Sequence, residues 1–301
     1  MLGVLTDPIL PVFAIALIGY ASGRTGWVGA GDARVLNRFA MTVLLPIFLF
    51  RAIATAPWPA FELVPLLAYV GVEALVYAAG FAVARNLFGR SRQEALLLGF
   101  AGVFVNNAYY TLPIAQFLGE PETTLAITSV IMVDSILAFA GTMIALEVMA
   151  GRDAGSSAGL VLTRVLRLPL LWAIAAAAVF AAGGLPLPGP LDTFAGFVGR
   201  AASPTALFAM GVILSVTPLR PEPLALLVIA VKVAVFPLAL WAAIVVLAPG
   251  TAPDGFLLSA AGPTGAMAFS MALLYEVRTR TIMQVTVWTT VATLATLAWL
   301  A

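Results

Sequence analysis

The hydrophobic positions of this chain form long runs, and short polar gaps separate each run from the next. A bilayer-spanning α-helix needs about 20 predominantly apolar residues, and each run reaches roughly that length. The gaps leave no room for a soluble domain, so the pattern predicts an all-α integral membrane protein with ten transmembrane helices. We expect these helices over residues 4–22, 34–55, 62–84, 94–118, 123–149, 165–183, 191–216, 222–247, 254–276 and 279–300.

Basic residues occupy every second gap between the runs. All but three of the 15 lysines and arginines lie in or beside the first, third, fifth, seventh and ninth gaps. Short cytoplasmic loops retain Lys and Arg, which places these gaps in the cytoplasm and both chain ends on the outer side. We therefore expect a multi-pass protein of the bacterial inner membrane. The basic residues concerned are Arg24, Arg34, Arg38, Arg85, Arg90, Arg92, Arg152, Arg164, Arg167, Arg220, Arg278 and Arg280.

Composition supports a membrane protein and excludes several functional classes. Hydrophobic residues make up 62% of the chain, charged residues make up 10%, and the mean hydropathy is +1.07. A soluble domain is about 45–50% apolar and about 25% charged. Because cysteine and histidine are both absent, thiol chemistry and the commonest metal ligand are excluded. We expect the lipid bilayer as a partner, and we expect no enzyme, no metal, no cofactor and no nucleic acid.

The segment 150–164 has the composition of a linker, beginning with AGRDAGSSAG. It divides the chain into two halves, residues 1–149 and 165–301, and each half holds five of the predicted helices. Because five is odd, a second half with the same fold must enter the membrane from the opposite side. Inverted repeats of this kind are typical of secondary transporters.

The fourth hydrophobic run carries a polar cluster at the middle of the membrane. Asn106, Asn107, Tyr110 and Thr111 precede Pro113 in the sequence FVNNAYYTLPIAQFLG. Proline removes one helical hydrogen bond and clashes with the preceding turn, and carbonyls freed in lipid need partners or a water-lined cavity. We therefore expect a broken helix here, in which the asparagine amides supply donors and acceptors.

The ninth run has a comparable interruption formed by Ser259, Pro263, Thr264 and Gly265 in SAAGPTGAMAFS. Glycine beside proline allows the backbone to unwind and another chain to approach closely. Two broken helices at matching positions of inverted halves indicate a substrate site at the midplane, where half-helix N-termini attract an anion. The alternative is that both prolines are ordinary kinks, which are common in membrane helices.

Three ionisable residues interrupt other hydrophobic runs: Glu73 in the third, Asp134 in the fifth and Lys232 in the eighth. Buried charges in a membrane are costly and usually face a partner or an aqueous path. A Glu73–Lys232 ion pair would neutralise both charges, either as a static contact or with a role in ion coupling. Asp134 has no obvious basic partner in the sequence, and we expect it to support the site.

Three segments resemble the auxin efflux carrier family: LNRFAMTVLLPIFLFRAIA, FVNNAYYTLPIAQFLG and AAGPTGAMAFSMALLYEV. The family's Asn and Pro of helix four fall on Asn106 and Pro113, and its Pro-x-Gly of helix nine falls on Pro263 and Gly265. The resemblance implies two inverted five-helix repeats in which helices four and nine cross beside the substrate. It also implies a scaffold of helices one, two, six and seven, a transport domain of the others, and a homodimer formed through the scaffold.

Sodium–bile-acid symporters and sodium–proton antiporters share this crossed-helix architecture. The resemblance matches Glu73 and Lys232 to a supporting site seen in some members. It does not transfer the substrate, because Tyr109 and Tyr110 stand where many members carry small residues.

The function expected from these features is secondary transport of a small organic anion by elevator-type alternating access. The anion would be a carboxylate resembling malonate, malate or auxin, and H⁺ or Na⁺ is a possible coupling ion. One alternative is a sodium-coupled symporter of the bile-acid type, with Asp134 and Glu276 as candidate cation ligands. A second alternative, of another class, is a membrane sensor or a channel.

Overall fold

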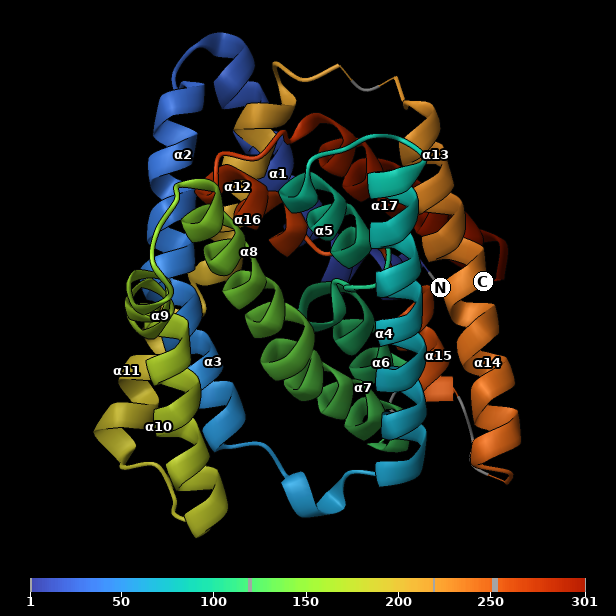
Figure 1. The fold of residues 1–301 in the computed structure, drawn as a ribbon. Coiled ribbons are helices and arrows are strands. Elements are labelled where there is room, and N and C mark those ends of the chain that lie inside the picture. Colours follow the sequence, from blue (N-terminus) through green and yellow to red (C-terminus); the bar gives the residue numbers. More distant parts are fainter. Residues whose placement is uncertain (1, 119–120, 219, 251–253, 301) are drawn as a thin grey trace.

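The computed structural model describes residues 2–118, 121–218, 220–250 and 254–300, and within these ranges it leaves aside the side chains of residues 2–13, 109, 113, 117, 118 and 294–300. The described chain is a bundle of helices (Figure 1). Its one β-type contact is an isolated antiparallel bridge between Val105 and Thr264. This bridge lies at the centre of the candidate site.

Each predicted run corresponds to one helix or to a short series of helices. The series are, in chain order, α1 (Leu2–Thr25); α2, η1 and α3 (Ala30–Phe39, Ala40–Leu44, Leu45–Ala54); α4 (Leu63–Asn86); α5, η3 and α6 (Arg92–Ala101, Asn107–Thr111, Leu112–Leu118); α7, η4 and α8 (Pro121–Asp134, Ser135–Phe139, Ala140–Asp153); α9 and α10 (Ala158–Leu166, Pro169–Gly183); α11 and α12 (Gly189–Gly199, Ala202–Leu214); α13, η5 and α14 (Pro223–Ala230, Val231–Val235, Phe236–Leu247); α15 and α16 (Asp254–Ala261, Met267–Leu274); and α17 (Arg280–Leu300). A short 3₁₀ turn, η2 (Trp58–Ala60), precedes α4.

Five helical stretches of the described chain are long and apolar enough to cross a membrane unaided. The bent pair α9 and α10, with an angle of 59° between its parts, makes a sixth candidate. The fourth and ninth runs are each divided into two short helices, so neither forms a continuous stretch of spanning length. The protein is therefore multi-pass by length and composition, while the full count of ten spans stays a prediction. The five stretches are Ala30–Ala54, Leu63–Asn86, Pro121–Asp153, Gly189–Leu214 and Pro223–Leu247.

Prolines inside the long helices are accommodated by π-helical turns. The turns η1, η3 and η5 each end two residues before a proline, which are Pro46, Pro113 and Pro237 respectively. A π-turn bonds residue i to i+5, so the carbonyl that a proline ring would strike is displaced from its α-helical position. The predicted break at Pro113 is therefore wrong. The chain passes from η3 into α6 without interruption, and the break lies earlier, between Ala101 and Asn107.

The linker predicted over 150–164 is mostly helical. Helix α8 continues to Asp153 and α9 begins at Ala158, with Ser157 accepting a hydrogen bond from Leu160 N–H as its N-cap. In Figure 1, α9 is viewed nearly end-on between α8 and α10. A Cβ atom added to Gly151 would lie 2.7 Å from Val161 Cγ2, so glycine is what permits α8 and α9 to pack so closely.

The helices pack as two groups. In the first group α1 and α2 pack on α12, and α3 packs on α10 and α11. In the second group α4 packs on α5 and α14, α7 packs on α15, and α13 packs on α17. Helix α16 packs on α5 and α17, so we count it with the second group, and it also packs on α2 of the first. The division into a scaffold and a transport domain, which the resemblance implies, stays a prediction.

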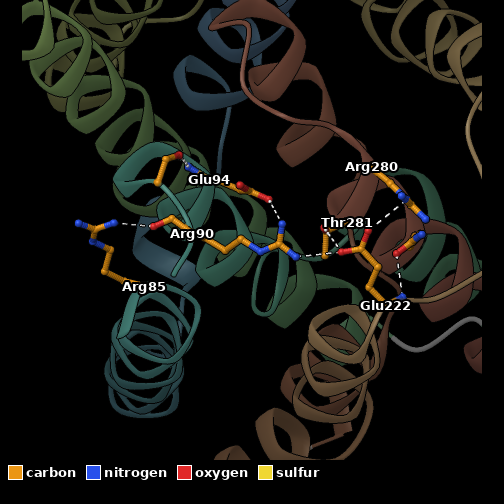
Figure 2. Close-up of polar contacts among 8 residues, drawn as sticks. Arg85, Arg90, Glu94, Glu222, Arg280 and Thr281 are labelled. Atoms are coloured by element: carbon orange, nitrogen blue, oxygen red, sulfur yellow. Dashed lines mark hydrogen bonds and ion pairs between the residues drawn. The ribbon is translucent and has the colours of Figure 1, made fainter. Parts of the chain in front are cut away.

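A network of ion pairs joins three helices of the second group at the arginine-rich end of the bundle (Figure 2). Glu222, which precedes α13, binds Arg90 at 2.9 Å and Arg280 at 3.1 Å and accepts a hydrogen bond from Thr281. Arg90 also binds Glu94 in the first turn of α5 at 3.2 Å. The network thus connects the beginnings of α5, α13 and α17, which come from both halves of the sequence.

Candidate functional site

The two broken helices cross at their breaks and are bonded to each other there. Asn106 N–H donates to Pro263 C=O at 2.9 Å, and Gly265 N–H donates to Phe104 C=O at 3.1 Å. A Cβ atom added to Gly262 would lie 2.6 Å from both Val105 Cγ1 and Thr111 Cγ2. The crossing therefore requires glycine at this position, in agreement with the close approach that the sequence predicts.

Side chains cap the C-terminal ends of both first half-helices. Thr264 Oγ1 donates at 2.7 Å to the carbonyl of Ala101, the last residue of α5. Lys232 Nζ donates at 2.6 Å to the carbonyl of Ala260, at the end of α15. The last carbonyls of a helix lack partners within it and carry partial negative charge. A hydroxyl at one crossing end and an ammonium at the other satisfy these carbonyls.

The N-terminal ends of both second half-helices face one small cavity. The first intrahelical bonds run from Tyr110 N–H to Asn106 C=O and from Ser270 N–H to Ala266 C=O, both at 2.9 Å. The N–H groups of residues 107–109 and 267–269 therefore come before the first bond of their helices. Residues 106–108 and 265–267 line a cavity of about 70 Å³. Two partially positive helix ends thus converge on one space.

The rest of the small cavity is formed by the first packing group and by the helix α7–η4. Phe48 and Ser203 lie on the first side, and Asp134 and Ser135 on the second. Asp134 is the one ionisable side chain among the described residues that line it, and it is an acid. Among the groups that line this cavity, partial positive charge is therefore offered only by backbone N–H groups and polar side chains.

A larger and mostly apolar cavity of about 240 Å³ lies on the other side of the crossing, between α1, α12 and α17. Asn106 lines both cavities, and Leu207 and Ala266 do so as well. The polar lining of the larger cavity comes from five further residues: Tyr20, Tyr110, Thr264, Thr286 and Thr290.

The structure brings together most of the site residues that the sequence predicts, though in different roles. Asn106, Asn107 and Gly265 line the small cavity, while Asn106, Tyr110, Pro263 and Thr264 line the large one. Thr111 lines neither cavity and instead donates to Asn107 Oδ1 at 2.7 Å. The Oγ atom of Ser259 is buried without a hydrogen-bond partner. The side chain of Pro113 lies outside the described residues.

Glu73, Asp134 and Lys232 meet behind the crossing, but not as the predicted ion pair. Lys232 is fully buried, and its ammonium donates a hydrogen bond to Ala260 C=O. No oxygen of Glu73 lies within 4.0 Å of Lys232 Nζ, the limit for an ion pair. The ion pairs of the described residues include none between Asp134 and Lys232 either. Glu73 Oε1 and Asp134 Oδ1 have no hydrogen-bond partner, and Tyr69 donates weakly to Asp134 Oδ2 at 3.4 Å.

Glu276, the other candidate sodium ligand, lies outside the crossing. It follows α16 at the arginine-rich end, has a left-handed φ of 55° and is exposed beside Arg90 and Arg278. It cannot join Asp134 in one cation site. Among the described residues no cluster of three or more acidic side chains forms a candidate metal site.

Several lining residues escaped the sequence analysis. Ser203, Thr286 and Thr290 contribute hydroxyls to the cavities but stand in segments without a break or a buried charge. Thr289 accepts a hydrogen bond from Thr264 N–H at 3.1 Å and so positions the crossing. The threonines of α17 recur at helical spacing, at 286, 289, 290 and 293. This periodic hydroxyl stripe is the signal that could have indicated a polar helix face.

Comparison with known proteins connects this geometry to a family. Residues 4–300 match the family described as membrane transport protein. A protein of Rhizobium meliloti (strain 1021), whose name proposes malonate transport, is 28% identical over 231 residues, covering 73% of this chain and 69% of that protein. The uncharacterized transporter YfdV of Escherichia coli (strain K12) is 26% identical over 249 residues, covering 71% and 70% respectively. An uncharacterized transporter of Methanothermobacter thermautotrophicus is 26% identical over 221 residues, with the same coverage. The chain therefore belongs to the membrane transport protein family, which is the auxin efflux carrier family, and is a membrane transporter.

Proposed function

We propose that this protein is a secondary transporter of a small organic anion, with a carboxylate bound at the crossing of the two broken helices. The observation that carries the proposal is the convergence of residues 106–108 and 265–267 on one small cavity. Two helix N-termini offer N–H donors and partial positive charge to an anion. Asn106, which lines both cavities, would bond to the carboxylate and to groups beside it.

The two packing groups support an elevator-type mechanism. The small cavity is bounded by Phe48 and Ser203 of the first group and by the crossing, which belongs to the second. A substrate held at the crossing would move with the second group past the first. The backbone bonds between residues 104–106 and 263–265 would keep the two half-helix pairs together during this movement.

The cluster of Glu73, Asp134 and Lys232 is the proposed position of ion coupling. It contains two acids and one base, so with all three ionised one negative charge stays uncompensated in a buried place. A proton or a sodium ion would neutralise it. Asp134 also lines the small cavity, which gives a coupling ion direct contact with the substrate space.

The positive-inside rule places the arginine-rich end in the cytoplasm and both chain ends outside a bacterial inner membrane. Two five-helix repeats of opposite orientation, and a homodimer formed through α1–α3 and α9–α12, complete the proposed assembly. No cofactor and no catalytic step is part of the proposal.

The test is charge movement by the purified protein in liposomes on a capacitive membrane. Malonate, malate, indole-acetate and a neutral analogue are added in turn, with and without sodium and at several pH values. We expect saturable currents or counterflow for at least one anion and none for the neutral analogue. Asn106→Ala should abolish them, while Ser259→Ala, which alters a hydroxyl outside both cavities, should retain them. Wild-type transport by Asn106→Ala would mean that the substrate does not bind at the crossing.

A further inference from the structure

The two packing groups are joined by a hydrogen bond that lies deep inside the bundle. Asn37 of α2 donates from Nδ2 to the backbone carbonyl of Ser270 in α16, at 2.8 Å and across 233 residues of sequence. Both side chains are fully buried, with 0% exposure. Helix α16 is the half-helix whose beginning lines the small cavity. The bond therefore ties the substrate-binding half-helix of the second group to a helix of the first.

The same contact leaves two polar atoms without partners. Asn37 Oδ1 and Ser270 Oγ are both buried and accept or donate no hydrogen bond. Buried polar atoms in proteins are nearly always bonded, and each exception calls for an explanation. A contact that was only structural would be more stable with apolar side chains at both positions, because burying an unpaired polar group is unfavourable.

The contact lies between the small cavity and the arginine-rich end. Asn37 precedes the cavity residue Leu45 by about two helical turns, and Ser270 follows the cavity residue Met267 by about one turn. Because both side chains are fully buried, α2 and α16 leave no room for water at this contact. Separation of these helices would open a route there and would expose the two unpaired atoms to water, which can bond to both.

We propose that Asn37 and Ser270 form a latch that closes the route from the substrate cavity to the arginine-rich side and opens by hydration. The Nδ2–carbonyl bond holds the latch closed, while the two unpaired atoms lower the stability of the closed state. This inference rests on the proposed alternating access, and it makes Asn37 a positioning residue that contacts no substrate.

Three substitutions separate a latch from an ordinary packing contact, because they act in different directions. Asn37→Leu removes the bond, but it also removes the unpaired Oδ1 and buries an apolar side chain of similar volume, which together should outweigh the lost bond and favour the closed state. Asn37→Asp removes the donor and places an acidic oxygen against a carbonyl, so it should favour the open state. Ser270→Ala removes an unpaired hydroxyl but keeps the bond to the backbone carbonyl, so it should shift the protein mildly towards the closed state.

The natural absence of cysteine allows a direct measurement of accessibility. Ser203→Cys places a near-isosteric thiol in the wall of the small cavity, on the first packing group. A membrane-impermeant thiol reagent is applied to proteoliposomes from the arginine-rich face, in the absence of any organic anion. We expect Asn37→Asp to raise the labelling rate by roughly tenfold and Asn37→Leu to lower it by a similar factor. Ser270→Ala should give a smaller decrease.

The proposal is overturned if Asn37→Asp and Asn37→Leu change the rate in the same direction, or if neither changes it. If Asn37→Asp does not fold, Asn37→Ala replaces it and should still label faster than Asn37→Leu. Because the assay contains no substrate, its outcome does not depend on which anion is carried. If the protein transports no anion but the two Asn37 variants shift the labelling rate in opposite directions, the latch is supported and the proposed function is wrong.

Discussion

Of the two glycines Gly262 and Gly265 at the crossing, Gly262 has less room for a side chain. Val105 Cγ1 and Thr111 Cγ2 each lie 2.6 Å from the position that a Cβ atom at Gly262 would take. These two side chains thus fill the space that a larger residue would need. Gly262→Ala should therefore lower the free energy of unfolding by about 1–3 kcal/mol, as overpacking does in other cores, and should weaken transport. Thermal unfolding in detergent measures the effect.

Gly141 provides the matched control for this substitution. It lies in α8, and nothing stands within 4 Å of the Cβ position. Gly141→Ala should be neutral or slightly stabilising, because alanine favours helix more than glycine does. Equal destabilisation by both substitutions would mean that the effect at Gly262 does not come from the crossing.

Lys232 illustrates which interactions of a single residue can be predicted from the sequence alone. That Glu73, Asp134 and Lys232 interact could be predicted, since buried charges in a membrane require partners. Which group bonds to which could not, because the choice depends on where α15 ends. Its terminal carbonyl at Ala260 takes the ammonium, and no sequence pattern gives that distance.

Lys232→Met should destabilise the protein by about 3–5 kcal/mol, since it leaves buried acids without their base. Neutralising an acid in the same chain should recover part of this loss. Asp134→Asn and Glu73→Gln each remove one of the two acids, and the variant that restores more stability identifies the acid whose charge Lys232 chiefly compensates. Thermal unfolding of the two double variants compares them directly. A larger recovery with Glu73→Gln would restore the Glu73–Lys232 pair as the dominant contact.

Among the elements, the two broken helices were predictable because glycine, proline and polar residues interrupt otherwise apolar runs. The exact place of one break was not. The sequence predicts that Pro113 ends a helix, but the π-turn η3 accommodates this proline within a continuous helix. The helix is interrupted instead at residues 102–106, which contain no proline. The bonds from Asn106 and Gly265 to the other broken helix compensate for the helical bonds lost there. Such tertiary compensation cannot be read from a single segment.

Glu222 provides a test of the ion-pair network that joins α5, α13 and α17 (Figure 2). Glu222→Gln should lower stability by about 1 kcal/mol, a value that allows for partial solvent screening of a side chain that is 25% exposed. The loss should shrink at high salt. Chemical or thermal unfolding at two salt concentrations measures both effects.

Glu62 is the control for Glu222, since it precedes α4 as Glu222 precedes α13. It is exposed and takes part in none of the ion pairs found in the described part of the chain. Glu62→Gln should leave stability and its salt dependence unchanged. If both variants behave alike, the network does not hold the arginine-rich end together.

At the scale of the whole molecule, the alternation of basic residues predicts the orientation in the membrane. Ala154 lies exposed at the arginine-rich end, and Ala60 lies exposed after α3, at the opposite end. In this cysteine-free chain, Ala154→Cys should react with an impermeant thiol reagent only from the cytoplasmic side, and Ala60→Cys only from the outside. Labelling in whole cells and in inverted vesicles decides the orientation. Reaction of both from one side would contradict the topology.

Much of the architecture followed from the sequence because hydrophobic run length and charge placement are whole-chain properties. The two cavities did not, since their walls combine Ser203, Asn106 and Thr290 from distant segments whose packing no local pattern gives. The ion-pair network also joins residues from both halves of the chain. The positive-inside rule uses its arginines only as charges in loops and does not predict that they pair with Glu222.

The convergence of two helix N-termini on the small cavity has a consequence for how such a transporter can diversify. Main-chain N–H groups have no side chain to replace, so no single substitution deletes the feature proposed to attract negative charge. The walls of the cavities can meanwhile change freely in size and polarity. A lineage built on this crossing that keeps Asn106 could exchange one anion for another through mutations elsewhere in the lining, and the attraction for negative charge would persist throughout.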